Sequence, residues 1–444
     1  MAIIKLKKGF DLRLEGQIGD GAQPERAAAG AAIGIVPDDF EGIVPRMDVR
    51  PGDTVLAGQV LYHDKTHEAI KVTSPVAGTV KDVCRGERRK ILAVVIEPDG
   101  KQAGEVTFDV KHPIKELLLE SGLWVMLRQR PYDVVPNPDV TPRDIFVTAF
   151  DSAPLAVNRN SLSADEQQLA EVAVKALSTL TPGKVYIGIS PSQDINVSGA
   201  VINTFDGPHP AGNAGVQIAN VKPVNKGETV WTLSLDTLLR IGTLLSTGRV
   251  DYNVTVAVAG PMVAEPKLVS TTIGASIDSV LAGNIKAGAE PRLIAGNVLS
   301  GVKVELDGYI RAPYTQLSVI AENNDPDEFM GWAALSPKRF SIYRLFTSWL
   351  AGLRSKPTNL DARIKGGERA IVRLDEYDDM LPMDIYAEFL IKAIIARNIE
   401  RMEELGIYEV APEDFALAEF ADTSKLELQR IVRDGLTWLR GEME

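Results

Sequence analysis

The residues best suited to chemistry are concentrated in one loop. Residues 205–215 hold a single histidine, His209, between glycines and prolines that make the loop permissive at some positions and stiff at others. An imidazole titrates close to neutral pH, so His209 could bind a ligand carbonyl or exchange a proton. In the alternative, which we favour because no second acid or base lies nearby in the sequence, the loop is an ordered turn and His209 bonds a backbone carbonyl.

A basic and aromatic stretch is the second candidate. It covers residues 331–346 of an otherwise acidic protein. Its notable residues are Trp332, Lys338, Arg339, Phe340 and Tyr343. Aromatic residues and arginine dominate the hot spots of interfaces, so the stretch could dock on a partner. An aromatic stripe of the core with solvated cations explains the composition equally well, and both interpretations stay open.

The remaining reactive side chains predict no centre of their own. The single cysteine, Cys84, excludes a disulfide framework and any cluster or zinc site built on several thiolates, and we expect an inert thiol without a partner. His63 and His67 are four residues apart on a predicted hairpin, where we expect them to be solvated. The paired carboxylates Asp38 and Asp39 are also expected to be solvated. No phosphate-binding loop, dinucleotide turn or catalytic elbow appears.

Length and charge set further limits. A chain of 444 residues with 45% hydrophobic and 24% charged residues predicts three or four domains with sizeable cores. Its net charge of −12 disfavours nucleic acid and anionic lipid as partners of the chain as a whole. No apolar run approaches the roughly 18–20 residues that cross a bilayer, and residues 1–10 are basic and strand-like without an apolar leader. We therefore predict a cytoplasmic protein that a protein partner holds at any membrane.

Two segments rich in valine and glycine predict a β-barrel within residues 1–100. Residues 49–61 and 72–80 alternate valines onto one face, with glycines at the turns. The pair resembles the flattened barrel of biotinyl and lipoyl carrier domains, in which a hairpin lysine takes the cofactor. Lys65 lies in this hairpin, but the arm looks longer than the carrier pattern. We interpret Lys65 as an ordinary exposed lysine.

Residues 101–255 alternate predicted helices and strands, which indicates a parallel sheet with crossover helices. The expected elements are helices at 114–124 and 164–177, strands at 145–150, 184–189 and 230–233, and a last amphipathic helix that ends near residue 245.

Residues 117–136 resemble the beginning of the flavin-binding fold in the NADH-oxidising flavoprotein of complex I. In that family Ser-Gly-Leu, here 121–123, leads into a glycine-rich loop whose NH groups approach the flavin phosphate. The loop predicted here, 124–132, contains no glycine and holds bulky side chains instead. We interpret the region as the flavoprotein scaffold with its flavin site filled by side chains.

The predicted third part, residues 256–330, contains a β-hairpin, a short helix at 277–281 and a strand at 293–295. Ser276 is the expected N-cap of the short helix. This order resembles the β-grasp module that binds soluble ligands (SLBB), which follows the flavin domain in proteins of complex I and of the Rnf complex.

Residues 331–444 are predicted to be helical. Helices are expected at 384–397, with Ile385, Phe389 and Ala393 on one apolar face, and at 425–439. Relatives in complex I and in the Rnf complex carry iron–sulfur cysteines in this part. This sequence has none there, so we interpret the helices as a scaffold.

These partial resemblances combine in one family. An α/β multidomain chain with a carrier-like barrel, a degenerate flavin domain, a β-grasp module and a cysteine-free helical tail is similar to NqrA proteins, the A-subunits of the bacterial Na+-translocating NADH:quinone reductase (the Nqr complex). The run Gly-Pro-His-Pro-Ala-Gly around His209 also resembles this family. The RnfC protein of the Rnf complex is a near relative, which the missing cysteines exclude.

The resemblance implies a peripheral position on the cytoplasmic face of the bacterial inner membrane. The complex oxidises NADH, reduces ubiquinone and exports Na+, with its flavins and iron–sulfur centre in other subunits. This chain would bind no cofactor or metal, act as a scaffold against NqrB in the membrane, and could also contact quinone. The residues to test for quinone or partner contact are Phe205, His209, Trp332, Lys338, Arg339, Phe340 and Tyr343. The alternatives are a free-standing flavin or NADH oxidoreductase and a non-catalytic binding protein that uses its carrier-like barrel.

Overall fold

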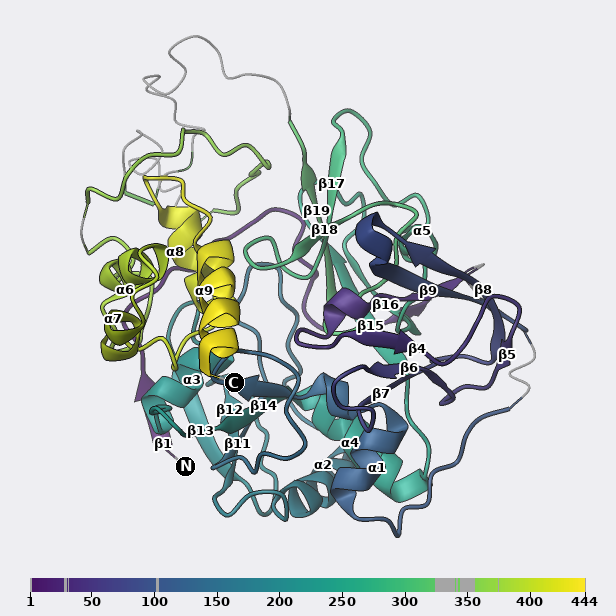
Figure 1. Ribbon diagram of the computed structural model, residues 1–444. Coiled ribbons are helices and arrows are strands. Elements are labelled where there is room, and N and C mark those ends of the chain that lie inside the picture. The colour runs from purple at the N-terminus through teal and green to yellow at the C-terminus, as the bar shows by residue number, and fades with distance from the viewer. Residues whose placement is uncertain are drawn as a thin grey trace.

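The computed structural model describes residues 2–27, 30, 32–100, 104–323, 340, 342–343, 356–373 and 375–443. Four parts surround a shared interior (Figure 1): the barrel on the right, an α/β sheet below, a second mixed sheet above the centre, and C-terminal helices on the left. None of the described helices is both long enough and apolar enough to cross a bilayer.

The α/β part is built on a six-stranded sheet of order β1-β13-β12-β11-β14-β10. Its strands are parallel except β10, which runs antiparallel to β14. The strands are β1 (Ala2–Lys5), β10 (Arg128–Arg130), β11 (Ile145–Thr148), β12 (Val185–Ile189), β13 (Val201–Asp206) and β14 (Val230–Ser234). The helices are α1 (Ile114–Ser121), α2 (Ala164–Leu177), α3 (Ala214–Val221) and α4 (Leu235–Thr247), with a 3-10 turn η3 (Trp124–Met126).

Alternation along β11 explains how helices cover both faces of this sheet. Ile145 and Val147 point into the core that α2 and α4 share, whereas Phe146 packs with Ile218 of α3 on the opposite face. The predicted parallel sheet with crossover helices is therefore confirmed. Helix α2 has the predicted limits because Ser163 closes a capping box with Glu166.

The barrel consists of a four-stranded sheet, β3-β9-β8-β5, and a three-stranded sheet, β4-β6-β7. The strands are β3 (Ile33–Ile35), β4 (Pro45–Met47), β5 (Thr54–Val55), β6 (Val60–Asp64), β7 (Lys71–Thr73), β8 (Gly78–Arg85) and β9 (Ile91–Pro98), with 3-10 turns η1 (Pro37–Asp39) and η2 (Glu87–Arg89). Lys65 is exposed in the turn that follows β6.

Two expectations about barrel side chains were wrong. His63 is not solvated, because its ring lies 2.7 Å from a carboxylate oxygen of Asp48 and is largely covered. Cys84 does have a partner: its thiol lies 3.5 Å from Asp82, and burial raises the pKa of the thiol. The register of β6 against β4 brings His63 near Asp48, whereas Cys84 and Asp82 lie two residues apart on β8.

A second six-stranded sheet has the order β18-β17-β19-β15-β16-β2. Its strands are β2 (Glu25–Arg26), β15 (Asn253–Ala259), β16 (Lys267–Thr272), β17 (Pro291–Ala295), β18 (Val302–Val304) and β19 (Gln316–Ala321), and its helix is α5 (Ile277–Leu281). The predicted hairpin is β15–β16. Ser276 does precede α5, but its side chain makes no capping hydrogen bond, contrary to expectation. Strands β1 and β2 lie outside the barrel, and each adds an edge to one of the large sheets.

The C-terminal part is helical over α6 (Ala387–Ile395), α7 (Ile399–Glu404), η7 (Pro412–Phe415), α8 (Ala416–Ala421) and α9 (Leu428–Met443). Helices α6 and α9 pack together, and Gly435 lets Ile394 approach closely. The expectation for Phe389 was wrong: its side chain points outward and is exposed. The inner face of α6 is made instead by Leu390, Ile391 and Ile394.

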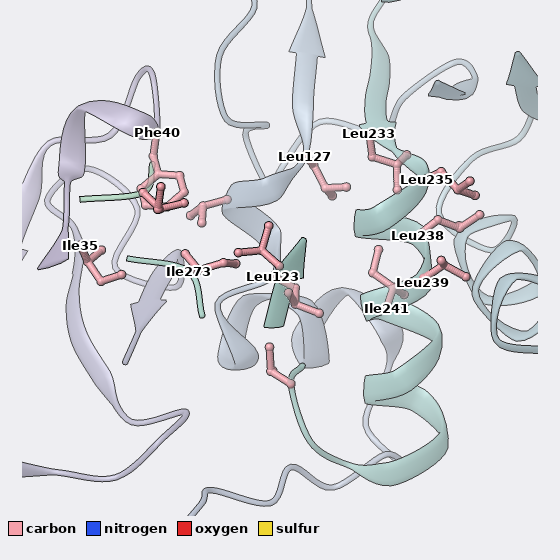
Figure 2. Packing of buried hydrophobic residues seen from close by; sticks show 14 of the residues in the cluster. Ile35, Phe40, Leu123, Leu127, Leu233, Leu235, Leu238, Leu239, Ile241 and Ile273 are labelled. Carbon is pink, nitrogen blue, oxygen red and sulfur yellow. The ribbon is translucent and has the colours of Figure 1, made fainter. Parts of the chain in front are cut away.

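The largest hydrophobic core joins three of the four parts. Figure 2 shows Ile35 and Phe40 of the barrel opposite Leu123, which follows α1, and Ile273, which follows β16. The apolar side of α4, including Leu238, continues the same core into the α/β sheet. Burying a side chain of this size contributes roughly 1.5–3 kcal/mol. Separating the barrel from its neighbours would expose several such side chains at once.

One buried carboxylate fastens this junction. Asp39 in η1 accepts hydrogen bonds from the guanidinium of Arg311 and from the backbone NH of Ala312, in the loop before β19. Its own backbone carbonyl accepts a 2.6 Å hydrogen bond from Arg128 of β10. Burial raises the pKa of Asp39, and Arg311 opposes the rise. The expectation of a solvated pair was therefore wrong for Asp39 and holds only for Asp38, which is half exposed beside Lys90.

Replacing Asp39 tests whether this carboxylate fastens the three parts. Asp39→Ala leaves the guanidinium of Arg311 buried without its partner, and we expect a loss of about 3–5 kcal/mol in the free energy of unfolding. Asp38→Ala is the matched control one residue away, where an exposed ion pair contributes at most about 1 kcal/mol. Urea denaturation of both variants measures the difference. Equal losses would show that burial of Asp39 has no special role.

Candidate functional site

The turn after α1 places the barrel where the sequence suggested a filled flavin site. Gly122 ends α1 with a φ of 78°. A Cβ at this position would lie 2.6 Å from the hydroxyl oxygen of Thr73 in β7. That hydroxyl donates to the carbonyl of Ser121 over 3.1 Å and lies 2.8 Å from the hydroxyl of Tyr252. The glycine is thus needed for close contact between two parts of the chain.

The residues after this turn form ordered structure instead of the predicted loop. Trp124 begins η3 and is fully buried, with its indole NH donating to the carbonyl of Pro136 over 2.8 Å. Its ring meets the edge of Trp231 with centroids 5.0 Å apart. Arg128–Arg130 then pairs with β14 as the last strand of the sheet. The loop expectation was wrong because a strand partner about 100 residues ahead in the sequence leaves no local signal.

A small cavity remains beside the turn. It measures about 30 Å³ and is lined by residues that include Phe40, Thr73, Gly122, Arg240 and Tyr252. Pockets that hold small-molecule ligands measure roughly 300–1,000 Å³. The space has room for a water molecule or two. It has no room for a tricyclic ring system unless the surrounding side chains move.

A buried charge cluster lies at the far end of β10. The guanidinium of Arg130 is fully enclosed and lies 2.8 Å from Glu413, 3.3 Å from Asp414 and 3.7 Å from Asp133. Arg433 of α9 completes it by donating to Asp133 over 2.6 Å. The cluster therefore joins the α/β sheet to η7 and α9 of the C-terminal part.

Burial and charge act in opposite directions within this cluster. Desolvation raises the pKa values of Glu413 and Asp414, and the charge of Arg130 opposes the rise. For Asp133, the charges of Arg130 and Arg433 exceed the desolvation and lower the pKa. Asp414 lies against the first turn of α3, where a Cβ on Gly215 would approach its carboxylate oxygen to 2.2 Å. A carboxylate of the chain thus occupies a helix N-terminus, a position that favours anions.

The loop that contains His209 is packed into the interior. The side chain of His209 is only 3% exposed, and its Nδ1 lies 3.0 Å from the hydroxyl oxygen of Ser152. Its backbone NH donates to Asp11, and its carbonyl accepts from the backbone NH of Phe10. The ring therefore bonds a serine hydroxyl, and the expected bond to a backbone carbonyl is wrong. Nε2 has no hydrogen-bond partner among the described residues.

Desolvation lowers the pKa of His209 to about 4. The imidazole is consequently neutral at physiological pH. It is a poor proton exchanger near neutral pH, which was one of the two roles considered for this residue.

The other candidate residues that the structure describes pack in hydrophobic cores. Phe205 is fully buried in the cluster that joins the α/β loops to the C-terminal helices, and Tyr343 packs against the same cluster. Phe340 lies between Phe10 and Phe420, with ring centroids 5.9 and 6.1 Å away. Since Phe10 also bonds His209, the structure brings these aromatic residues and the histidine loop into one packed region. Trp332, Lys338 and Arg339 lie outside the described residues.

The charged contacts between parts were not found from the sequence. Arg130 and Asp414 are 284 residues apart, and neither stands in a motif. The available signals were weak: Arg130 lies between apolar stretches, and Asp414 follows a proline at the start of a short helix. No group of three or more histidine, cysteine or acidic residues within the described chain is arranged to hold a metal ion.

Comparisons with known proteins identify similar chains. The family model described as "NqrA N-terminal barrel-sandwich hybrid domain" matches residues 4–99, "NqrA second alpha/beta domain" matches 110–250, and "NQRA C-terminal domain" matches 255–305. These matches agree with the barrel, the α/β sheet and the third part of the fold described above.

Full-length relatives share one name. A protein of Saccharophagus degradans, named as the A-subunit of Na(+)-translocating NADH-quinone reductase, is 35% identical over 99% of this chain and 100% of its own length. A protein of Serratia proteamaculans with the same name is 36% identical over the same shares. Among solved structures, an air-oxidized NAD+-reducing [NiFe]-hydrogenase aligns over 75% of this chain and 67% of its own, with 12% identity and a TM-score of 0.36.

The buried state of His209 predicts a pH dependence of stability. Its pKa in the folded chain, about 4, lies below the ordinary value of 6.5, so the unfolded chain takes up the proton first as the pH falls. The neutral histidine therefore contributes its full stability above pH 6.5 and loses it towards pH 4. Between pH 7.5 and 4.5 we expect wild type to lose roughly 2–3 kcal/mol more than His209→Gln in urea denaturation. His112→Gln, at an exposed histidine, should follow wild type; a parallel loss in His209→Gln would contradict the assignment.

The cluster around Arg130 gives a second test. Arg130→Met leaves the carboxylate of Asp414 buried without its cation, and we expect a loss of about 3–5 kcal/mol in the free energy of unfolding. Adding Asp414→Asn to the same chain should restore part of that loss, because the unpaired charge is then removed. Arg401→Met, at an exposed pair with Glu404, is the control and should cost at most about 1 kcal/mol. If the losses in the free energy of unfolding caused by Arg130→Met and Asp414→Asn simply add in the double variant, the two residues do not act as a pair.

Proposed function

Because the chain belongs to the NqrA family, the A-subunits of Na(+)-translocating NADH-quinone reductases, we propose that it serves this oxidoreductase complex as a peripheral scaffold. In this proposal it sits on the cytoplasmic face of the membrane against NqrB, the neighbouring membrane protein of the complex. The complex couples NADH oxidation and ubiquinone reduction to Na+ export. Electrons pass through flavins and an iron–sulfur centre held by other subunits.

The observation that carries the proposal is the filled space beside Gly122. A flavin phosphate needs free backbone NH groups and room for its ring. At this position Thr73 and Tyr252 from neighbouring parts approach the turn, and Trp124 is enclosed behind it. The remaining cavity, about 30 Å³, supports the proposal that the chain holds no flavin at this position.

The contacts between parts support a scaffold role. Asp39 connects the barrel to the second mixed sheet and to β10, and Arg130 connects β10 to the C-terminal helices. Buried charges held by several partners resist relative motion, since each partner lost leaves a charge without compensation. A chain fastened in this way offers fixed surfaces to other subunits.

The proposal gives quinone no contact with Phe205 or His209. Both side chains are enclosed, and a quinone could reach them only if the loop of His209 left its place. The bonds from Phe10 and Asp11 to that loop would then be broken. Of the residues considered for partner contact, Phe340 and Tyr343 also contribute to cores.

Two alternatives predict different properties. A free-standing flavin or NADH oxidoreductase would need a pocket in place of the packed Trp124 and Trp231. A carrier protein would carry a lipoyl or biotinyl group on Lys65, which is exposed. The intact mass of the purified chain detects such a group, and we expect the unmodified value.

Affinity purification tests the proposed role. A tagged chain expressed in its own cells and extracted from membranes with mild detergent should recover a complex of several subunits with flavin absorbance. The same chain purified alone should be colourless and should not oxidise NADH. Yellow colour in the isolated chain, or recovery of the chain without other subunits from cells that contain the complex, would contradict the proposal.

A further inference from the structure

The outer side of α6 is apolar and uncovered. Tyr386, Phe389 and Ile395 are 67%, 51% and 57% exposed, although the opposite side of the helix is packed against α9. The helix lies at the left margin of the molecule in Figure 1. A helix that is apolar on nearly all sides is normally buried, so its outer side is expected to meet another surface.

A neighbouring segment extends this surface. An open groove of about 580 Å³ separates α6 from residues 368–371, with Leu426 also in its lining. Ile395 and Lys392 form the wall on the α6 side. Val372, the next residue of the segment, is 83% exposed. We call the surface formed by Arg369, Val372, Tyr386, Phe389, Lys392 and Ile395 the α6 patch.

Two cations border the groove. Arg369 and Lys392 line the groove, although the chain as a whole carries a net charge of −12. Within the described residues, no ion pair links Arg369 or Lys392 to a carboxylate. Glu368 is the one acidic residue that lines the groove. Cations outside ion pairs, beside exposed apolar groups, indicate a surface that binds an anionic and partly apolar partner.

We propose that the α6 patch binds the anionic phospholipid surface of the membrane, with phosphate headgroups as the ligands. This inference rests on the proposed function, because it gives the peripheral scaffold its own contact with the bilayer. Overall negative charge repels an anionic membrane, so the patch also determines which side of the chain approaches it.

The position of Lys392 favours lipid over a protein partner. Its ammonium group lies 5.6 Å from the centre of the Phe389 ring, among the apolar side chains of the patch. Charged residues are depleted from the centres of protein interfaces, and lysine in particular. At a bilayer surface the same lysine can lay its methylene chain along the acyl region and reach a phosphate with its amine. Tyrosine and phenylalanine beside it match the composition of residues that lie at the membrane–water boundary.

Vesicle binding by the purified full-length chain tests the inference. We expect sedimentation with vesicles of phosphatidylcholine containing about 30% phosphatidylglycerol, and little with phosphatidylcholine alone. Lys392→Glu should weaken binding about tenfold or more, because it reverses a charge at the surface. Phe389→Ser should weaken it by a similar factor through lost apolar burial. Neither side chain is buried, so the thermal unfolding midpoint should stay that of wild type.

Matched controls separate this surface from general effects. Lys65→Glu makes the same change in net charge on the barrel, and Ile3→Ser removes an exposed apolar side chain from β1; both should bind like wild type. Equal binding of neutral and anionic vesicles, or wild-type binding by Lys392→Glu, would overturn the inference. Wild type that binds no vesicles would overturn the lipid assignment. If Phe389→Ser then also fails to copurify with the other subunits from detergent extracts, the patch contacts another protein. Failure of the proposed function would appear in a different measurement: wild type itself would not copurify with other subunits from detergent extracts.

Discussion

A buried charge must keep its partner, and this constraint determines how the parts of the chain are held. Asp39 and Arg130 are enclosed, and each is compensated by groups from other parts of the molecule. Taking such groups out of water costs several kcal/mol per ion, which only close pairing offsets. The arrangement therefore contributes less to net stability than to relative position. Any other placement of the barrel or of the C-terminal helices would leave Asp39 or Arg130 buried without its partner.

The filled region beside Gly122 depends on the same positions. Thr73 can reach the turn only while β7 of the barrel lies against α1, and Tyr252 reaches Thr73 only while β15 keeps its place. The large core between these parts adds the apolar contacts that Figure 2 shows. The close packing beside Gly122 and the junction between the parts are thus two results of one packing arrangement. The proposed scaffold role would use both, since a packed interior transmits position to its surface.

The molecule also differs between its two sides. The α/β sheet and the barrel expose apolar side chains on separate elements, such as Ile3 of β1 and Leu92 of β9, whereas α6 exposes Phe389 and Ile395 on a single helix, with Tyr386 just before it. The first arrangement is that of a chain surrounded by water. The second is that of a chain with a neighbour. Arg369 and Lys392 beside α6 add positive charge to this surface.

Local and periodic features were determined by the sequence itself. Helix α2 followed from its capping residues, the β15–β16 hairpin from its alternating strands, and the parallel sheet from the order of helices and strands. These features depend on residues close together in the chain, so the linear sequence contains their cause. The resemblance of whole segments to one family was also visible without coordinates. The matches to three family models and to full-length relatives confirmed it.

Tertiary structure alone decided the rest. Whether Asp39 is solvated, whether residues 128–130 form a strand, and whether Phe389 faces water depend on elements tens to hundreds of residues away. His209 is the clearest case: the sequence favoured an ordered turn in which its ring bonds a backbone carbonyl, but the ring contacts Ser152 instead. Phe10 and Asp11 hold the backbone of the loop, and desolvation lowers the pKa of the imidazole. Burial is a property of the packed chain, and the pKa, pairing and exposure of a side chain follow from burial.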